Sequence, residues 1–115
     1  MARMTVIRRL IEKNLTNPAL GVDWISGKVG LSRTKLYELF EPLGGVAKYI
    51  RERKLRQALI MLTDKAAAHY STYDIALVSG YANDAAFVRA FRARYGVTPG
   101  DVRAAGHQRR NIVCG

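Results

Sequence analysis

Apolar residues recur along most of this chain at the three- or four-residue spacing of an α-helix, and almost nowhere alternate as in a β-strand. In residues 5–15, for example, Val6, Ile7, Leu10 and Ile11 share one side of a helix, with charged residues between them. The same spacing predicts helices over residues 5–15, 22–29, 33–40, 46–63, 73–79, 84–95 and from Pro99 onward. The pattern therefore predicts an all-α fold of about seven helices.

Glycine and proline residues mark the breaks between these helices, and polar residues suited to capping follow some of the breaks. Ser32, for instance, is a good N-cap for the helix over 33–40. Residues predicted to face the core include Trp24, Ile25, Ile75 and Leu77. Residues 105–115 lack helical periodicity, so a flexible tail is expected there.

The chain repeats a helix–turn–helix pattern after about fifty residues. The segment WISGKVGLSRTKLYELF aligns with DIALVSGYANDAAFVRAF, so that Ile25 matches Ile75 and the turn glycine Gly30 matches Gly80. A turn glycine supplies a backbone conformation with positive φ at low cost. The repeat predicts a first helix-turn-helix unit (5–43), a linker helix (45–64) and a second helix-turn-helix unit (72–104) within one domain, 4–104.

The predicted linker helix has a suitable length for placing two such units on DNA. At 1.5 Å per residue, the stretch 46–63 would be roughly 27 Å long. B-DNA presents its major groove on one face about every 34 Å. The linker could therefore place the second helix of each helix-turn-helix unit near one of two successive major-groove segments.

Charge indicates what kind of partner such a helical protein would bind. The 115 residues include 19 Lys and Arg against 9 Asp and Glu, a net charge of +10. Residues 1–64 carry twelve basic and six acidic groups, and residues 65–115 carry seven and three. Because both parts are positive, the excess is not a basic tail, and it favours DNA, RNA or an anionic membrane surface as partner.

Other chemistry finds little support in the composition. Cys114 is the single cysteine, and His69 and His107 are the only histidines, so no disulfide, metal site or cofactor is predicted. Neither histidine belongs to a set with a carboxylate and a nucleophile, which argues against an enzyme. No run of roughly 18 apolar residues predicts a membrane span, and the composition suggests a cytoplasmic location.

Three segments, SRTKLYELF, GGVAKYIRERKLRQA and DIALVSGYANDAAFVRAFRARYGVTPGDVR, together resemble the DNA-binding domain of the AraC/XylS family of bacterial transcription regulators. The resemblance covers residues 4–104, and its most specific part is RAFRARYGVTP. It implies two helix-turn-helix subdomains that insert their second helices into adjacent major-groove segments of double-stranded DNA. It also implies transcription activation through contact with RNA polymerase, as in many members.

The sequence departs from the family pattern at a few positions. Family members often have alanine at Ser26, serine or threonine at Ala86, and tyrosine at Val102. We interpret the changes at Ser26 and Val102 as mild packing changes, whereas Ala86 lacks a hydroxyl that could touch a phosphate. Most members also carry an N-terminal sensing or dimerisation domain. We expect this chain to be the C-terminal part of such a regulator, with a short stand-alone regulator as the alternative.

The helix over 33–40 provides the first set of candidate DNA contacts. The side chains predicted to point away from the core are Arg33, Thr34, Lys35, Tyr37 and Glu38. The resemblance makes Thr34, Tyr37 and Glu38 base readers, since threonine can pack on a thymine methyl and glutamate can accept from a cytosine amino group. The alternatives are that Glu38 pairs in solvent with Arg33 or Lys35, and that Tyr37 is partly core.

The helix over 84–95 provides the second set. Its candidate DNA contacts are Asn83, Asp84, Ala85, Val88, Arg89 and Arg92. Arg89 is the strongest base-reading candidate, because arginine can bond to guanine through two hydrogen bonds. An intramolecular pair with Asp74 or Asp84 is the alternative. Arg92 is expected to meet phosphate or solvent.

A weaker set of phosphate contacts is predicted outside the base-reading positions: Lys48, Tyr49, Arg53, Arg94 and Arg103. A solvated charged face is an equally good interpretation of the linker residues in this set. For Arg103, a pair with a helix end is the alternative.

Three function classes are compatible with a basic helical domain. A sequence-specific regulator of transcription agrees best with the repeat and the charge. A general nucleic-acid binder without sequence preference is the second interpretation, but the aromatic residues mostly fall at core spacing, where they cannot stack on bases. An enzyme or a helical interaction module would not need a charge of +10.

Overall fold

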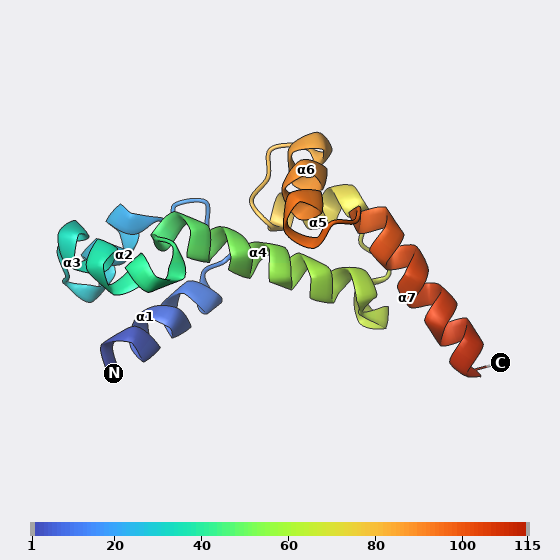
Figure 1. Cartoon of the computed structure of the whole chain (residues 1–115), viewed down its shortest axis with the longest axis horizontal. Helices are drawn as coiled ribbons and strands as arrows, with labels where there is room; N and C mark the ends of the chain where they lie inside the picture. The colour runs from blue at the N-terminus through green and yellow to red at the C-terminus, as the bar shows by residue number, and fades with distance from the viewer. Residues whose placement is uncertain (1, 115) are drawn as a thin grey trace. The chain divides into compact units, whose positions relative to one another are not determined.

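A computed structural model describes the backbone of residues 2–114 and the side chains of residues 3–106 (Figure 1). Within these residues the chain forms seven α-helices and two short 3-10 helices, with no strand. In chain order they are α1 (Ala2–Lys13), α2 (Val22–Val29), α3 (Arg33–Phe40), η1 (Glu41–Leu43), α4 (Val46–Thr63), η2 (Lys65–Ala67), α5 (Thr72–Val78), α6 (Asp84–Tyr95) and α7 (Pro99–Cys114). The predicted all-α fold class is confirmed.

The chain divides into two compact units, Met1–Lys54 and Leu55–Gly115. The division lies inside α4, the predicted linker helix. Val46 and Ile50 from its first half are buried in the core of unit one. Leu55 and Leu62 from its second half are buried in the core of unit two. Each half of α4 is therefore part of the unit on its own side, in addition to linking the two.

The core of unit one is built from the apolar stripes of α1 to α4. Its buried residues are Ile7, Ile11, Leu15, Ile25, Leu36, Phe40, Val46 and Ile50. Trp24 is half-buried and packs against this cluster. Burying one large apolar side chain stabilises a fold by about 1.5–3 kcal/mol. The stripe of Leu36 and Phe40 thus fixes which side of α3 faces inward.

The core of unit two combines aliphatic residues with two phenylalanines of α6. Its buried residues are Leu55, Ala58, Leu62, Ile75, Ala76, Phe87 and Phe91. The rings of Phe87 and Phe91 lie 5.7 Å apart, and Tyr81 and Tyr95 extend the stack at 5.6 and 4.8 Å. This packing fixes the inward side of α6. The prediction that Leu77 is core was wrong, because its side chain is 45 % exposed.

The turn glycines of the repeat adopt the conformation that the sequence predicts. Gly30, at the C-terminus of α2, has φ 72°, and Gly80, after α5, has φ 85°. Left-handed backbone of this kind strains any residue with a Cβ atom. The turns between α2 and α3 and between α5 and α6 therefore depend on glycine.

Helix α7 extends to Cys114, and so includes residues 105–114 of the segment 105–115 for which the sequence predicted a flexible tail. Gly106 interrupts the helical pattern of the sequence, but a single glycine inside a helix costs only about 1 kcal/mol. No proline follows it to stop the helix. The flexibility of this segment stays a prediction, and the side chains of 107–115 lie outside the described residues.

Candidate nucleic-acid interface

The side of α3 that faces away from the core carries the first set of predicted DNA contacts. Ser32 caps the helix, its hydroxyl accepting a hydrogen bond from the Lys35 N–H at 3.1 Å. The predicted contacts Arg33, Thr34, Lys35, Tyr37 and Glu38 are all exposed. We call these five residues the outer face of α3. Tyr37 is 53 % exposed, so it is not part of the buried core.

An open groove runs along this outer face. It is lined by Thr34, Tyr37, Glu38, Glu41, Gly44 and Gly45. The three residues that the resemblance assigns to base reading therefore share one surface. Lys48 lies beside it, because a Cβ atom added to Gly44 would come within 2.7 Å of the Lys48 Cδ.

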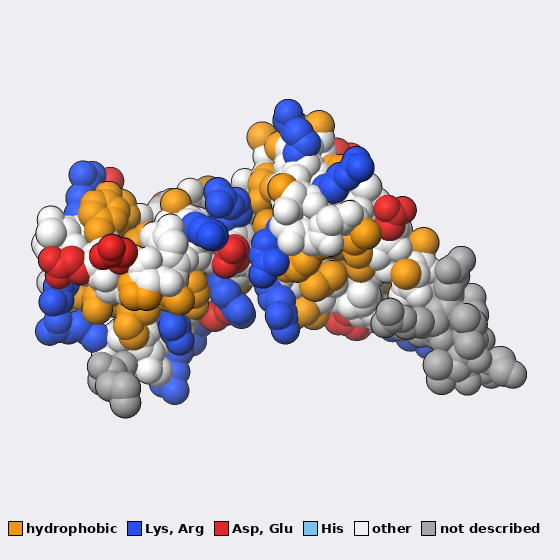
Figure 2. All heavy atoms as spheres, in the orientation of Figure 1, with side chains coloured by type: hydrophobic (Ala, Val, Ile, Leu, Met, Phe, Trp, Pro, Cys, Tyr) orange, Lys and Arg blue, Asp and Glu red, His pale blue; other side chains and the backbone are white. Residues whose placement is uncertain are grey.

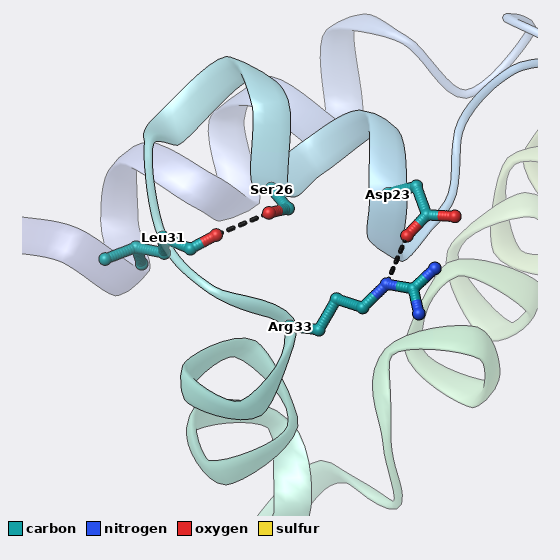
Figure 3. Close-up of polar contacts among 4 residues, drawn as sticks. All are labelled: Asp23, Ser26, Leu31 and Arg33. Atoms are coloured by element: carbon teal, nitrogen blue, oxygen red, sulfur yellow. Dashed lines mark hydrogen bonds and ion pairs between the residues drawn. The ribbon is translucent and has the colours of Figure 1, made fainter.

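Each of the two basic side chains on the outer face of α3 pairs with an acidic residue. Lys35 Nζ lies 3.7 Å from Glu38 Oε2, so one of the two pairs considered for Glu38 is present. Arg33 pairs instead with Asp23 of α2, its Nε donating to Oδ1 at 2.5 Å (Figure 3). This hydrogen bond lowers the pKa of Asp23 and raises the pKa of Arg33. The guanidinium and carboxylate are therefore both charged at neutral pH.

Helix α6 presents the second set of predicted contacts. Asp84, Ala85, Arg89 and Arg92 are exposed, and Val88 is half-buried. We call these five residues the outer face of α6. The predicted alternative for Arg89 is absent from the part of the chain that the structure describes, since no pair joins it to Asp74 or Asp84. The carboxylate of Asp74 instead accepts a hydrogen bond from the Ser71 N–H at 3.1 Å, in the capping box of α5.

Asn83 occupies the N-cap of α6. Its Oδ1 accepts a hydrogen bond from the Ala86 N–H at 2.9 Å. Asparagine recognises adenine through both its oxygen and its nitrogen, and capping engages the oxygen. A DNA contact by Asn83, which stays a prediction, would therefore use its Nδ2 group.

The weaker set of predicted phosphate contacts divides into outward and inward side chains. Lys48 and Arg94 are exposed, and the Arg94 guanidinium lies 5.1 Å from the centre of the Tyr95 ring. Tyr49 is half-buried and packs on Phe40 at 5.3 Å. Their DNA contacts stay predictions, and the geometry favours those of the two exposed residues.

Arg53 and Arg103 are the inward-facing cations of this set. Arg53 forms an ion pair with Glu12 of α1, and its Nε is buried. Arg103 Nη1 donates to the Tyr70 carbonyl at 2.7 Å, while its Nε and Nη2 are buried. Both cations are half-buried, so the geometry favours a role in bracing the fold over a phosphate contact.

Sequence reasoning missed the contacts of two residues beside this interface, Asp23 and Ser26. The interpretation of Ser26 as a mild packing change did not include its hydroxyl, which donates to the Leu31 carbonyl at 2.5 Å (Figure 3). Asp23 holds Arg33, which lies ten residues later. No periodicity indicates such a pair, and only a search for opposite charges near the start of a recognition helix could have suggested it.

Basic side chains are spread over both units. Figure 2 shows Lys and Arg on the visible face of each unit, among fewer acidic residues. Among the described residues, no three His, Cys, Asp or Glu are grouped as metal ligands would be. None of the helices searched in that same part of the chain is long and apolar enough to cross a membrane.

The fold and the two outer faces define a protein with paired helix-turn-helix units. The family model described as "Helix-turn-helix domain" matches residues 25–105. The chain is 33 % identical over 92 residues to "Probable transcription factor PqrA" of Proteus vulgaris, covering 78 % of this chain and 73 % of that protein. It is 31 % identical over 108 residues to "Regulatory protein SoxS" of Salmonella typhimurium, covering 90 % of this chain and 97 % of that protein.

A solved structure agrees with these relatives. It is a transcriptional regulator from Chromobacterium violaceum described as having an AraC-type DNA-binding domain, with a TM-score of 0.81 and 33 % identity over 90 % of this chain and 91 % of that one. The present chain belongs to the AraC-type helix-turn-helix family of DNA-binding transcription regulators. Membership of this family also confirms the prediction that the chain is not an enzyme.

Proposed function

We propose that this protein is a sequence-specific regulator that inserts α3 and α6 into successive major-groove segments of double-stranded DNA. The observation that carries the proposal is the same in both units. A helix packs one side into an apolar core through Leu36 and Phe40, or Phe87 and Phe91, and leaves its other side exposed. An exposed second helix of a helix-turn-helix is the element that enters the major groove.

The chemistry of the outer face of α3 supports reading of bases over binding of phosphates alone. A surface built only for phosphate would carry unopposed cations, because phosphate attraction depends on positive charge. Here Glu38 and Asp23 accompany Lys35 and Arg33. Hydroxyl, phenol and carboxylate groups gathered on one groove can instead meet the donors, acceptors and methyl groups of base edges.

On α6, Arg89 is the best candidate for a base contact. It is exposed and lies in the middle of the helix, two turns before Gly96 ends it. Its lack of an acidic partner among the described residues leaves the whole guanidinium available for guanine. Arg92 and Arg94 follow toward the C-terminus of α6, where they would approach phosphates and add affinity without sequence information.

Activation of transcription, contact with RNA polymerase and an N-terminal sensing or dimerisation domain belong to the proposal as implications of the family resemblance. The proposed place of action is the cytoplasm, where a bacterial regulator meets its DNA.

A general basic nucleic-acid binder is the second candidate function, and the net charge of +10 favours it. Such a protein would bind all duplexes with similar affinity and lose that affinity steeply as salt rises. A salt titration alone does not separate the candidates, because both rely on phosphate contacts. A measurement of sequence preference separates the two candidates.

The deciding experiment is in vitro selection of the purified chain against a random duplex library at near-physiological salt. The expected result is an asymmetric motif with two boxes about 10 base pairs apart, one for each unit. Direct titration of the winning duplex, of its scrambled version and of its single strands then measures the preference. Recovery of a library without any enriched motif would overturn the sequence-specific proposal and favour the second candidate.

A further inference from the structure

Arg33 is the first residue of α3, and Asp23 of α2 holds it through one of its donors. The bond joins Asp23 Oδ1 to Arg33 Nε at 2.5 Å, and Figure 3 shows it reaching from one helix to the start of the next. A guanidinium carries five N–H donors in a planar fork. Within the described part of the chain, neither terminal nitrogen of Arg33 makes a hydrogen bond. The end of the fork is therefore free.

We propose that Asp23 is a positioning residue that directs Arg33 toward a base edge of DNA, with guanine preferred, and away from the phosphates. This inference rests on the proposed function, since it assigns a reading role at the start of α3. The N-terminal residues of a recognition helix are those that contact base edges in helix-turn-helix complexes. Guanine offers O6 and N7 as two neighbouring acceptors for the terminal nitrogens of one arginine.

The charge of Asp23 explains why a base would be chosen over a phosphate. A phosphate brought to the guanidinium also approaches the Asp23 carboxylate, and the two negative charges repel. The guanine edge is uncharged and meets no such repulsion. The pKa of Asp23 is lowered by its hydrogen bond with Arg33, so its carboxylate is ionised wherever DNA binding takes place near neutral pH. The Asp23–Arg33 pair thus disfavours a phosphate contact, which would carry no sequence information.

The fold of unit one does not depend on this pair. The side chains of Arg33 and Asp23 are 60 % and 70 % exposed, and exposed ion pairs contribute little to stability. The turn before α3 has its own bonds, from Ser26 to the Leu31 carbonyl and from Lys35 N–H to Ser32. By contrast, the side chains of the Arg53–Glu12 pair, which joins α4 to α1, are only 40 % and 39 % exposed. Removing Asp23 should therefore leave the fold intact.

The test uses the full chain and the motif that selection returns for it. Dissociation constants are measured for the best duplex and for duplexes with each base pair of the box changed in turn. The variants are Asp23→Asn, Asp23→Glu, Arg33→Ala and the double variant Asp23→Asn with Arg33→Ala. Asp64→Asn is the matched control, since it removes the same charge at an exposed cap that asparagine also provides. Circular dichroism checks that each variant is folded.

The protein is expected to prefer guanine at one base pair by roughly 5- to 150-fold over the other bases. Asp23→Asn should lower that ratio several-fold, while its affinity for random duplex stays equal or rises. Asp23→Glu should retain most of the ratio, because a longer carboxylate can still reach Nε. Arg33→Ala should abolish the preference for guanine at the same base pair. Adding Asp23→Asn to it should then change this preference no further. Asp64→Asn should leave the ratio unchanged.

Three results would overturn the inference and leave the proposed function standing. The first is an unchanged preference for guanine in Asp23→Asn together with a lost preference in Arg33→Ala. The second is an equal loss of affinity for every sequence in Arg33→Ala, which would make Arg33 a phosphate contact. The third is an unfolded Asp23→Asn, which would make the pair a brace of the fold. Selection that returns no motif would instead overturn the proposed function, and this inference with it.

Discussion

The hydroxyl of Ser26 donates a hydrogen bond to the backbone carbonyl of Leu31, 2.5 Å away, across the turn between α2 and α3. The matching residue of unit two is Ala76, which has no hydroxyl. There the Tyr81 N–H donates to the Ala76 carbonyl at 3.0 Å. The two helix-turn-helix units are thus closed by different bonds at matching positions, a side-chain bond in unit one and a backbone bond in unit two.

Ser26→Ala should therefore destabilise unit one. Loss of one hydrogen bond between half-buried groups is expected to lower the free energy of unfolding by about 0.5–1.5 kcal/mol. Urea denaturation followed by circular dichroism measures the change. Thr34→Ala is the control, because it removes an exposed hydroxyl that makes no hydrogen bond within the described residues. Equal stability of the Ser26→Ala variant and the unchanged protein would show that the bond contributes nothing.

Gly27 and Gly30 provide a matched pair of glycine substitutions in and after the same helix. A Cβ atom at either would find no atom within 4 Å, so sterics with neighbours do not separate them. Gly30 has φ 72°, and Gly30→Ala should destabilise by about 1–2 kcal/mol through left-handed strain. Gly27 lies inside α2, and Gly27→Ala should stabilise by about 0.5–1 kcal/mol. Thermal unfolding of both variants checks the opposite signs, and a shared sign would contradict the strain argument.

The helices and cores of both units could be predicted because burial imposes a period on the sequence. Leu36, Phe40, Phe87 and Phe91 are all buried where helical spacing placed them. Leu77 was misassigned because it lies in an unbroken apolar run inside the seven-residue helix α5. Such a short helix contains too few turns for spacing to tell its inner from its outer side.

Contacts between distant side chains could not be predicted in the same way. Arg33 with Asp23 and Arg103 with Tyr70 join residues ten and thirty-three positions apart. Which rotamer a long side chain adopts depends on the surface beside it, and that surface exists only after the helices have packed. Sequence therefore indicated which cations face outward on α6 better than it indicated what each cation touches.

Arg103 provides a test of whether an inward-facing cation serves the fold. Its Nη1 bond to the Tyr70 carbonyl, at 2.7 Å, joins α7 to the loop before α5. Arg103→Ala should lower the free energy of unfolding by about 1.5–3 kcal/mol, since the bond involves a charged donor. The dependence of DNA affinity on salt should not change. If instead the slope of log affinity against log salt concentration is reduced by about one unit while stability is unaltered, Arg103 contacts a phosphate.

Asn83 allows capping and base reading to be separated. Asn83→Ala should destabilise by about 1 kcal/mol, because the Ala86 N–H loses its acceptor. Asn83→Ser restores a capping oxygen but removes the amide nitrogen. We expect the serine variant to recover the lost stability, because its hydroxyl can accept from the Ala86 N–H, and to alter the selected DNA motif at one base pair, because it lacks the Nδ2 group. Thermal unfolding and a repeat of the selection measure the two effects. An unchanged motif would show that Nδ2 reads no base.

Arg89 and Arg92 differ in what their removal should do to DNA binding, although both are exposed arginines on α6. Arg89→Ala should weaken binding to the best duplex by about 1–3 kcal/mol and relax the preference at one base pair. Arg92→Ala should weaken binding to all duplexes alike and reduce the salt slope by about one unit. Titrations of the best duplex and of its single-base variants at several salt concentrations distinguish these effects. If Arg89→Ala instead weakens every duplex equally, Arg89 contacts a phosphate, and the base contacts of α6 fall to the remaining candidates, Asn83, Asp84, Ala85 and Val88.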